Sequence, residues 1–248
     1  MARWKSFAAV YFLSACMWAQ AADSVPHWGY EGHGGADHWS ELDKAFEVCK
    51  LGKTQSPIDI VTAQVESVAG APIKPAYKSS PAKVANNGHT IVVHLADGGS
   101  VTVPSGTYKA VQFHFHAPSE EKIDGKSFPM VAHIVHSNDA GKLAVIAVLF
   151  NEGAENAALK EIFSALPARE GEQPIKPFDT TALLPATLPY FAFEGSLTTP
   201  PCSEGVAWQV LKTPSTMSAA QIEAFRKIFP MNARPVQPLN GRKVTVTQ

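Results

Sequence analysis

The sequence lacks an excess of charge of either sign. Its 21 Lys and Arg residues face 22 Asp and Glu residues, so the formal net charge of the 248-residue chain is −1. Neither a basic block nor an acidic tail occurs along it. Because nucleic acids attract proteins mainly through clustered positive charge, we expect no nucleic-acid partner.

Long apolar runs and internal repeats are also missing. Beyond residue 21 no apolar run is long enough to span a membrane, and no heptad or repeat pattern is present. The composition, with 45% hydrophobic and 17% charged residues, is typical of a globular domain. A domain of this length buries most of its apolar surface unaided, so a metal would serve chemistry more than folding.

The N-terminus is predicted to be a signal peptide spanning residues 1–21. A short basic start precedes an uncharged, mostly apolar stretch at 6–18 and the small-x-small site Ala19-Gln20-Ala21. Residues 22–248 would then form the mature domain, in the periplasm or secreted, as a monomer or dimer. Two alternatives stay open. Residues 13–16 also fit a lipoprotein signal that would anchor the chain through Cys16, and the stretch could instead be a buried helix.

Cysteines are scarce, with three in the chain, and Cys16 lies in the predicted signal. Cys49 and Cys202 remain, far apart in the sequence. Two such cysteines in a secreted chain usually pair, so we predict a disulfide between them, with two free thiols as the alternative.

Short apolar runs separated by turn signals dominate the rest of the chain. They predict strands at 90–95, 101–103, 111–115, 131–135 and 143–150. Helical periodicity is confined to 156–166 and to a stretch that starts near Ser218, where Gln221 completes a capping box. Residues 23–53 are predicted to be an irregular packed arm. The expected fold is a single, mainly β (α+β) domain with peripheral helices.

Histidines recur in two of these predicted strands. Residues 111–116 alternate strictly, so His114 and His116 project from one face. In the next predicted strand, His133 and His136 lie on opposite faces, and one of them could supply a third imidazole. Three neutral imidazoles with an open fourth position are typical of catalytic zinc. Histidines satisfied as polar groups on a half-buried sheet are the alternative.

Several segments resemble the alpha carbonic anhydrases. Residues 112–116, 119–120 and 132–136 are similar to the zinc-binding core of that family, and Gly195-Ser196-Leu197-Thr198-Thr199-Pro200-Pro201-Cys202 is similar to its most diagnostic loop. Further similar segments lie at 27–30, 55–60, 86–89 and 232–235. The segments follow the family's order between residues 27 and 238.

This resemblance implies a fold, a cofactor and a reaction. The fold would be a large, mostly antiparallel twisted sheet with a zinc site at its centre. The cofactor would be Zn²⁺ held by His114, His116 and His133. The enzyme, a lyase, would reversibly hydrate CO₂ to bicarbonate and a proton by the attack of zinc-bound hydroxide.

The resemblance also implies roles for single residues. Thr198 would orient the hydroxide by accepting its hydrogen bond and would donate its own hydroxyl hydrogen bond to Glu120, while Thr199 would line the bicarbonate site. His89 would shuttle protons to buffer. Gln112 would form a hydrogen bond with the outer nitrogen of His114, that is, the ring nitrogen that does not ligate the zinc. The apolar CO₂ site would be lined by residues whose alternative role is core packing, namely Val135, Val145, Leu197, Val206 and Trp208.

One position departs from the family pattern. A glutamate is usual two residues before the third ligand, and Val131 stands there. Valine accepts no hydrogen bond, so the outer nitrogen of His133 needs another partner or water. Glu121 stands where a histidine is common. The rival functions are a silent binding protein on this scaffold, a zinc esterase, and an exported adhesion or carbohydrate-binding module. The first typically lacks one of the zinc histidines.

Overall fold

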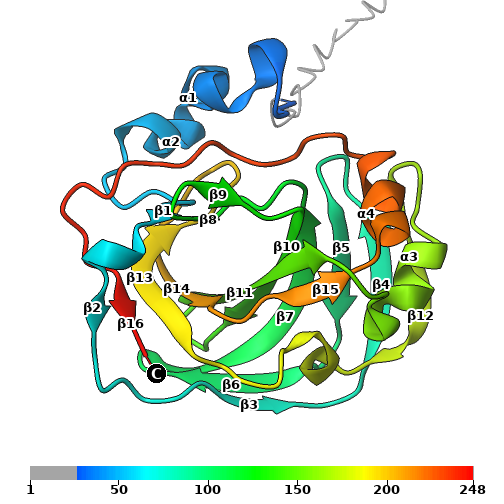
Figure 1. The fold of residues 1–248 in the computed structure, drawn as a ribbon. Helices are drawn as coiled ribbons and strands as arrows, with labels where there is room; N and C mark the ends of the chain where they lie inside the picture. The colour runs from blue at the N-terminus through cyan, green and yellow to red at the C-terminus, as the bar shows by residue number, and fades with distance from the viewer. Residues whose placement is uncertain (1–26, 248) are drawn as a thin grey trace, which may run out of the picture.

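The computed structural model describes residues 27–247. The predicted signal peptide and Cys16 lie outside the described residues. Within that range, 13 strands form one large twisted sheet, and three short strands form a second one. Figure 1 shows the large sheet curving around the middle of the molecule.

The path through the large sheet differs from the order of strands in the sequence. It runs through β12 (Gly171–Phe178), β4 (Ser80–Asn86), β5 (Ile91–Leu95), β7 (Gly106–His116), β10 (Met130–Ser137), β11 (Leu143–Glu152), β14 (Glu204–Leu211), β13 (Tyr190–Ser196), β16 (Thr245–Val246) and β2 (Glu66–Ser67). Off this path lie β3 (Lys74–Tyr77), β6 (Gly99–Val103) and β15 (Ser215–Met217).

In the large sheet most neighbouring strands are antiparallel, as expected, and three pairs are parallel: β11 with β14, β11 with β15, and β16 with β2. The strands β10 and β11 are covered on both faces, and residues 144–150 of β11 are all buried. Their continuous Val, Ile, Leu and Ala content fits such central strands, where both faces need apolar side chains.

Helices lie at the edge of the sheet and in the N-terminal arm (Figure 1). At the edge are α3 (Lys160–Ser164) and α4 (Ala219–Arg226), and α4 starts with the predicted capping box of Ser218 and Gln221. The arm carries α1 (Trp39–Leu42), α2 (Val48–Leu51) and the 3₁₀ turns η1 (Gly32–Gly34), η2 (Ala36–His38) and η3 (Lys44–Phe46). Three further 3₁₀ turns are η4 (Thr62–Gln64), η5 (Ala157–Leu159) and η6 (Thr180–Leu183).

The prediction of an irregular N-terminal arm was wrong about its local structure, because the arm consists of short helical turns. Turns of three or four residues are too short to show helical periodicity.

The small sheet contains β1 (Asp59–Ile60), β8 (Lys122–Ile123) and β9 (Lys126–Ser127). Strand β8 pairs in parallel with β1 and antiparallel with β9. This sheet fixes residues 117–121, which connect β7 to β8.

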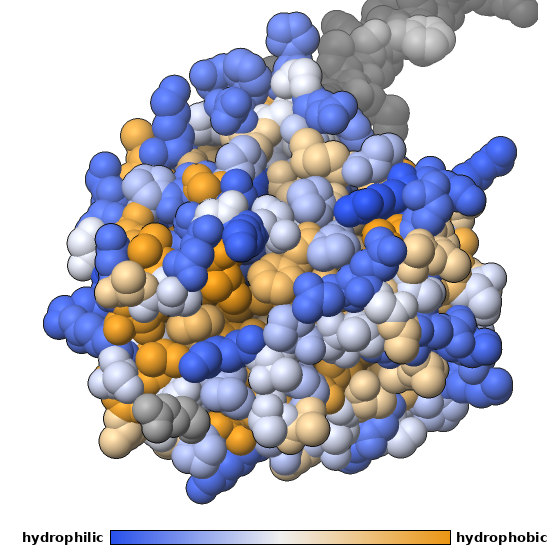
Figure 2. All heavy atoms as spheres, in the orientation of Figure 1, coloured by the Kyte–Doolittle hydropathy of each residue, from blue (hydrophilic) through white to orange (hydrophobic). Residues whose placement is uncertain are grey.

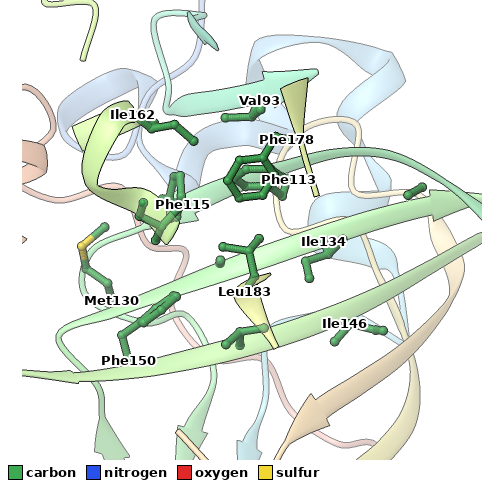
Figure 3. Close-up of a cluster of buried hydrophobic side chains, with 14 of the residues drawn as sticks. Val93, Phe113, Phe115, Met130, Ile134, Ile146, Phe150, Ile162, Phe178 and Leu183 are labelled. Carbon is green, nitrogen blue, oxygen red and sulfur yellow. The ribbon is translucent and has the colours of Figure 1, made fainter. Parts of the chain in front are cut away.

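The two faces of the central strands bury different clusters. On one face the larger cluster includes Phe113, Phe115, Ile134 and Ile146, and Figure 3 shows these side chains gathered with Ile162 of α3. On the other face a second apolar cluster includes Val131, Val135, Val145, Val206 and Trp208. His114 and His116 of β7 and His133 of β10 share this second face.

The surface is mixed. Figure 2 shows polar side chains over most of the visible face, with apolar ones gathered around its concave middle, over β13 and β14. Among residues 27–247, no helix has both the length and the apolar content needed to cross a bilayer.

Candidate metal centre

Three histidines meet at the middle of the large sheet. His114 and His116 lie two residues apart on β7, and His133 lies directly opposite His114 on β10. One ring nitrogen from each lies within 4.8 Å of the other two. His116 and His133 are buried, and His114 is half-buried. His136 points to the other face, where its Nε2 lies 2.8 Å from the Tyr77 hydroxyl.

Each of the three rings is held through its outer nitrogen. His114 Nδ1 lies 2.9 Å from Gln112 Oε1, and His116 Nδ1 lies 2.6 Å from the carbonyl oxygen of Asn232. His133 Nε2 lies 3.1 Å from Glu121 Oε2. Partners of this kind fix the tautomer of a ligating imidazole and aim its free nitrogen.

The inner nitrogens suit a metal ion. They are Nε2 of His114, Nε2 of His116 and Nδ1 of His133, and His116 Nε2 is buried with no hydrogen-bond partner among the described residues. A buried acceptor without a partner is costly, and a bound cation would satisfy it. Three imidazole nitrogens are a typical set for catalytic zinc, so the residues fit this ion.

Burial sets the protonation of two of these rings. It lowers the pKa of His114 to about 3, with a smaller effect of the neighbouring His133, and it holds the pKa of His116 well below its usual range. Burial also acts to lower the pKa of His133, but the charges of Glu121 and Glu120 and the hydrogen bond to Glu121 raise it overall. His114 and His116 are therefore neutral at physiological pH, as metal ligation requires.

Glu120 lies at the inner side of the histidine cluster. Its Oε2 lies 3.4 Å from His116 Nε2 and 3.8 Å from His133 Nδ1, and its Oε1 accepts the backbone N–H of Arg234 at 2.8 Å. Burial raises the pKa of Glu120 to about 7, against the opposing effects of His133 and of a hydrogen bond from Thr198. Thr198 is thus near enough to Glu120 to act on its pKa, and the roles that the resemblance implies for the two residues stay predictions.

Thr198 lies in the loop 197–203 between β13 and β14, and this loop is tied down at several points. Cys202 forms a disulfide with Cys49, with an S–S distance of 2.06 Å, as predicted. The Leu197 N–H donates to the carbonyl oxygen of Ser203 at 2.9 Å, and the Cys202 N–H donates to that of Thr199 at 2.8 Å. Thr198 is buried, whereas Thr199 is half-buried.

The residues expected around CO₂ all belong to one cluster. Val135, Val145, Val206 and Trp208 are buried in it, and Leu197 packs against it. The Trp208 ring meets the His133 ring edge-on, with 4.9 Å between centroids. This cluster therefore borders the histidines directly.

His89 lies outside this cluster, after β4, in a turn held by its neighbours. Its N–H donates to Asn87 Oδ1 at 3.0 Å, and its half-buried ring stacks on Trp28 with 3.6 Å between centroids. Partial burial and the nearby His27 lower the pKa of His89, with a smaller opposing effect of Glu170. The ring is thus mainly neutral at neutral pH and able to accept a proton.

Asn232 and Arg234 contribute to the site, and the sequence analysis gave them no role. Asn232 accepts from His116 and donates through its Nδ2 to the carbonyl oxygens of His89 and Phe115. Arg234 donates to the Cys49 carbonyl oxygen at 2.7 Å and to the Ser56 carbonyl oxygen at 2.8 Å. Both lie between α4 and β16, on a segment that runs beneath the N-terminal arm (Figure 1). The motif at 232–235 was the available signal, but the partners of Asn232 and Arg234 in the site lie far away in the sequence.

Comparisons with known proteins agree with this geometry. The sequence matches the family described as eukaryotic-type carbonic anhydrase over residues 34–248. A carbonic anhydrase of Pectobacterium atrosepticum is 46% identical over 239 residues, which cover 95% of this chain and 97% of the relative. A carbonic anhydrase of Neisseria gonorrhoeae is 46% identical over 242 residues, covering 95% of this chain and 94% of the relative.

Solved structures give the same result. The alpha-carbonic anhydrase of Thermovibrio ammonificans, in complex with the inhibitor sulfanilamide, superposes with a TM-score of 0.86 at 45% identity. The superposition covers 89% of this chain and 99% of that chain. With its three converging histidines and this degree of similarity, the chain belongs to the alpha, or eukaryotic-type, carbonic anhydrase family of zinc-dependent enzymes that hydrate CO₂.

Proposed function

We propose that this chain hydrates CO₂ with a zinc ion held by His114 Nε2, His116 Nε2 and His133 Nδ1. The observation that carries the proposal is the convergence of three inner nitrogens whose rings are each fixed from outside. When bound, zinc lowers the pKa of a water molecule to about 7 and so makes a nucleophile available at neutral pH.

Thr198 and Glu120 would orient that nucleophile. A threonine hydroxyl has one proton to donate, and Glu120 would be the acceptor for it, since Thr198 is near enough to lower the pKa of this carboxyl. The Thr198 oxygen would then be left to accept a hydrogen bond from the nucleophile and so to direct it at the carbon of CO₂. The Arg234 backbone N–H holds the Oε1 oxygen of Glu120 in place.

Binding of CO₂ would use the apolar cluster beside His133. CO₂ is apolar and is expected to bind beside apolar side chains, which hold no water by hydrogen bonds. The residues of this cluster that would contact it are Val135, Val145, Leu197, Val206 and Trp208. Thr199, half-buried at the edge of the same loop, would bind the bicarbonate that forms. Gln112 would hold the His114 ring during turnover.

His89 would carry the released proton to solvent buffer. We expect His89→Ala to lower kcat in weak buffer while kcat/KM for CO₂ hydration stays nearly unchanged, because the proton leaves after the chemical step. Stopped-flow assays with and without added imidazole test this, since a free imidazole can replace the missing one. Equal losses in both parameters without rescue would instead place His89 in the chemical step or in the fold.

A stopped-flow CO₂ hydration assay tests the function as a whole. Activity should disappear with a zinc chelator and return with zinc. Sulfanilamide, the inhibitor in the Thermovibrio complex, should inhibit it. Activity that survives complete zinc removal would refute the proposal.

Ester hydrolysis by the same nucleophile is the second candidate reaction, but the apolar cluster favours CO₂. All three histidines are present, which argues against a silent binding protein.

We also propose that the enzyme acts in the periplasm or outside the cell. The disulfide is consistent with an oxidising compartment, and residues 1–21 have the pattern of a signal peptide. Lipid attachment at Cys16 is the alternative.

A further inference from the structure

The outer nitrogen of His133 has its partner in an unexpected part of the chain. Both carboxylate oxygens of Glu121 lie close to His133 Nε2, Oε1 at 3.0 Å and Oε2 at 3.1 Å. Glu121 belongs to the connection between β7 and β8, whereas His133 lies on β10. The partner therefore comes from outside the strand that carries the ligand.

Strand β10 has a position from which a polar side chain could reach His133, and an apolar residue occupies it in this chain. On β7, Gln112 precedes His114 by two residues and reaches its outer nitrogen along the same strand face. Residue 131 has the same spacing from His133 on β10. Val131 is fully buried there, packed into the apolar cluster that also contains Ile58 and Ile60.

Glu121 is held in position by its surroundings. The Ser119 hydroxyl donates to the Glu121 carbonyl oxygen at 2.7 Å, and the Phe128 N–H donates to that hydroxyl at 2.8 Å. The next residue, Lys122, donates its N–H to the Ile58 carbonyl oxygen at 3.2 Å. The carboxylate is fully buried, and His133 is its cationic or hydrogen-bonding partner. A buried carboxylate needs such a partner to persist in the folded chain.

The geometry points to Glu121 as the positioning residue that fixes the His133 imidazole for zinc, with Val131 kept apolar because the carboxylate already comes from the loop. This inference rests on the proposed zinc site. A second carboxylate at position 131 would lie beside Glu121 and near Glu120, three buried acids around one imidazole, and like charges at that range disfavour each other.

The test measures how fast zinc leaves the purified holoenzyme to an excess of a chromogenic chelator. Glu121→Gln should release zinc about 10- to 100-fold faster, the usual range for losing such a partner. Val131→Glu alone should release zinc no more slowly than the wild-type enzyme and should have a lower melting temperature.

The exchange variant, Glu121→Val with Val131→Glu, should restore release toward the wild-type rate, because the strand position then supplies the carboxylate. Glu223→Gln, a surface residue of α4, is the matched control for loss of one carboxylate.

The outcomes separate this inference from the function that it rests on. Wild-type enzyme that binds no zinc would refute the proposed site. Zinc-loaded wild type with unchanged release in Glu121→Gln, or slower release in Val131→Glu, would overturn the role of Glu121 alone. If Glu121→Gln does not fold, the exchange variant decides: near-normal zinc release supports the role, and release about 10-fold or more faster than from wild type contradicts it.

Discussion

Replacing His114 with alanine is expected to abolish CO₂ hydration and to remove stoichiometric zinc. Two imidazoles would remain, and two such ligands hold zinc poorly in a site built for three. The fold should persist, since the larger apolar cluster lies on the opposite face of β7 and includes neither histidine nor metal. Metal analysis and stopped-flow kinetics measure the loss, and circular dichroism checks the fold.

A matched control is available on the neighbouring strand. His94 on β5 lies opposite Gln112 in the register and is exposed. His94→Ala should keep full zinc content and activity. Near-normal hydration by His114→Ala, or equal losses in both variants, would contradict the assignment of the metal centre.

Removing the disulfide should produce the largest change in stability. Cys49 and Cys202 are separated by 153 residues, and closing a loop of that length is worth roughly 4 to 5 kcal/mol in the chain-entropy model. The double variant Cys49→Ser/Cys202→Ser should therefore lose about that much free energy of unfolding in denaturant titrations. Activity should also fall, because Cys202 anchors the loop that carries Thr198.

Other contacts limit how far the structure would loosen. The Arg234 guanidinium still donates to the Cys49 carbonyl oxygen. It also makes a cation–π contact with Trp39, with 5.5 Å between its Cζ and the ring centroid, and this contact holds the N-terminal arm. We thus expect a folded but less stable enzyme. Mass spectrometry that finds two free thiols in the oxidised wild type, or an unchanged unfolding midpoint in the double variant, would contradict this prediction.

The metal centre was predictable to the extent that it depends on alternation along strands. His114, His116 and Gln112 share a face because successive side chains of a strand alternate, and this property needs no knowledge of the fold. The capping box at Ser218 was predictable for a similar reason, since its contacts span three residues. The five apolar residues that are expected to line the CO₂ site came from resemblance, and in the structure four of them belong to one cluster and Leu197 packs against it.

The remaining parts depend on contacts between distant segments. The partner of His133 could not be found from the spacing on β10, which gave only Val131, because Glu121 reaches it through the placement of the loop against β1 and Phe128. The same holds for Asn232, whose bond to His116 joins residues 116 positions apart. A strand pattern carries no information about such partners.

The sequence by itself thus determined the class of the fold, the paired histidines, the pairing of the two cysteines and, through its motifs, the family. The tertiary structure alone decided which groups hold the outer nitrogens of His116 and His133, and that the N-terminal arm folds as short helical turns. The physical reason is the separation along the chain over which each property is set. Side-chain direction along a strand follows from the local backbone, whereas the partner of a buried nitrogen is set by packing among segments that the chain brings together only on folding.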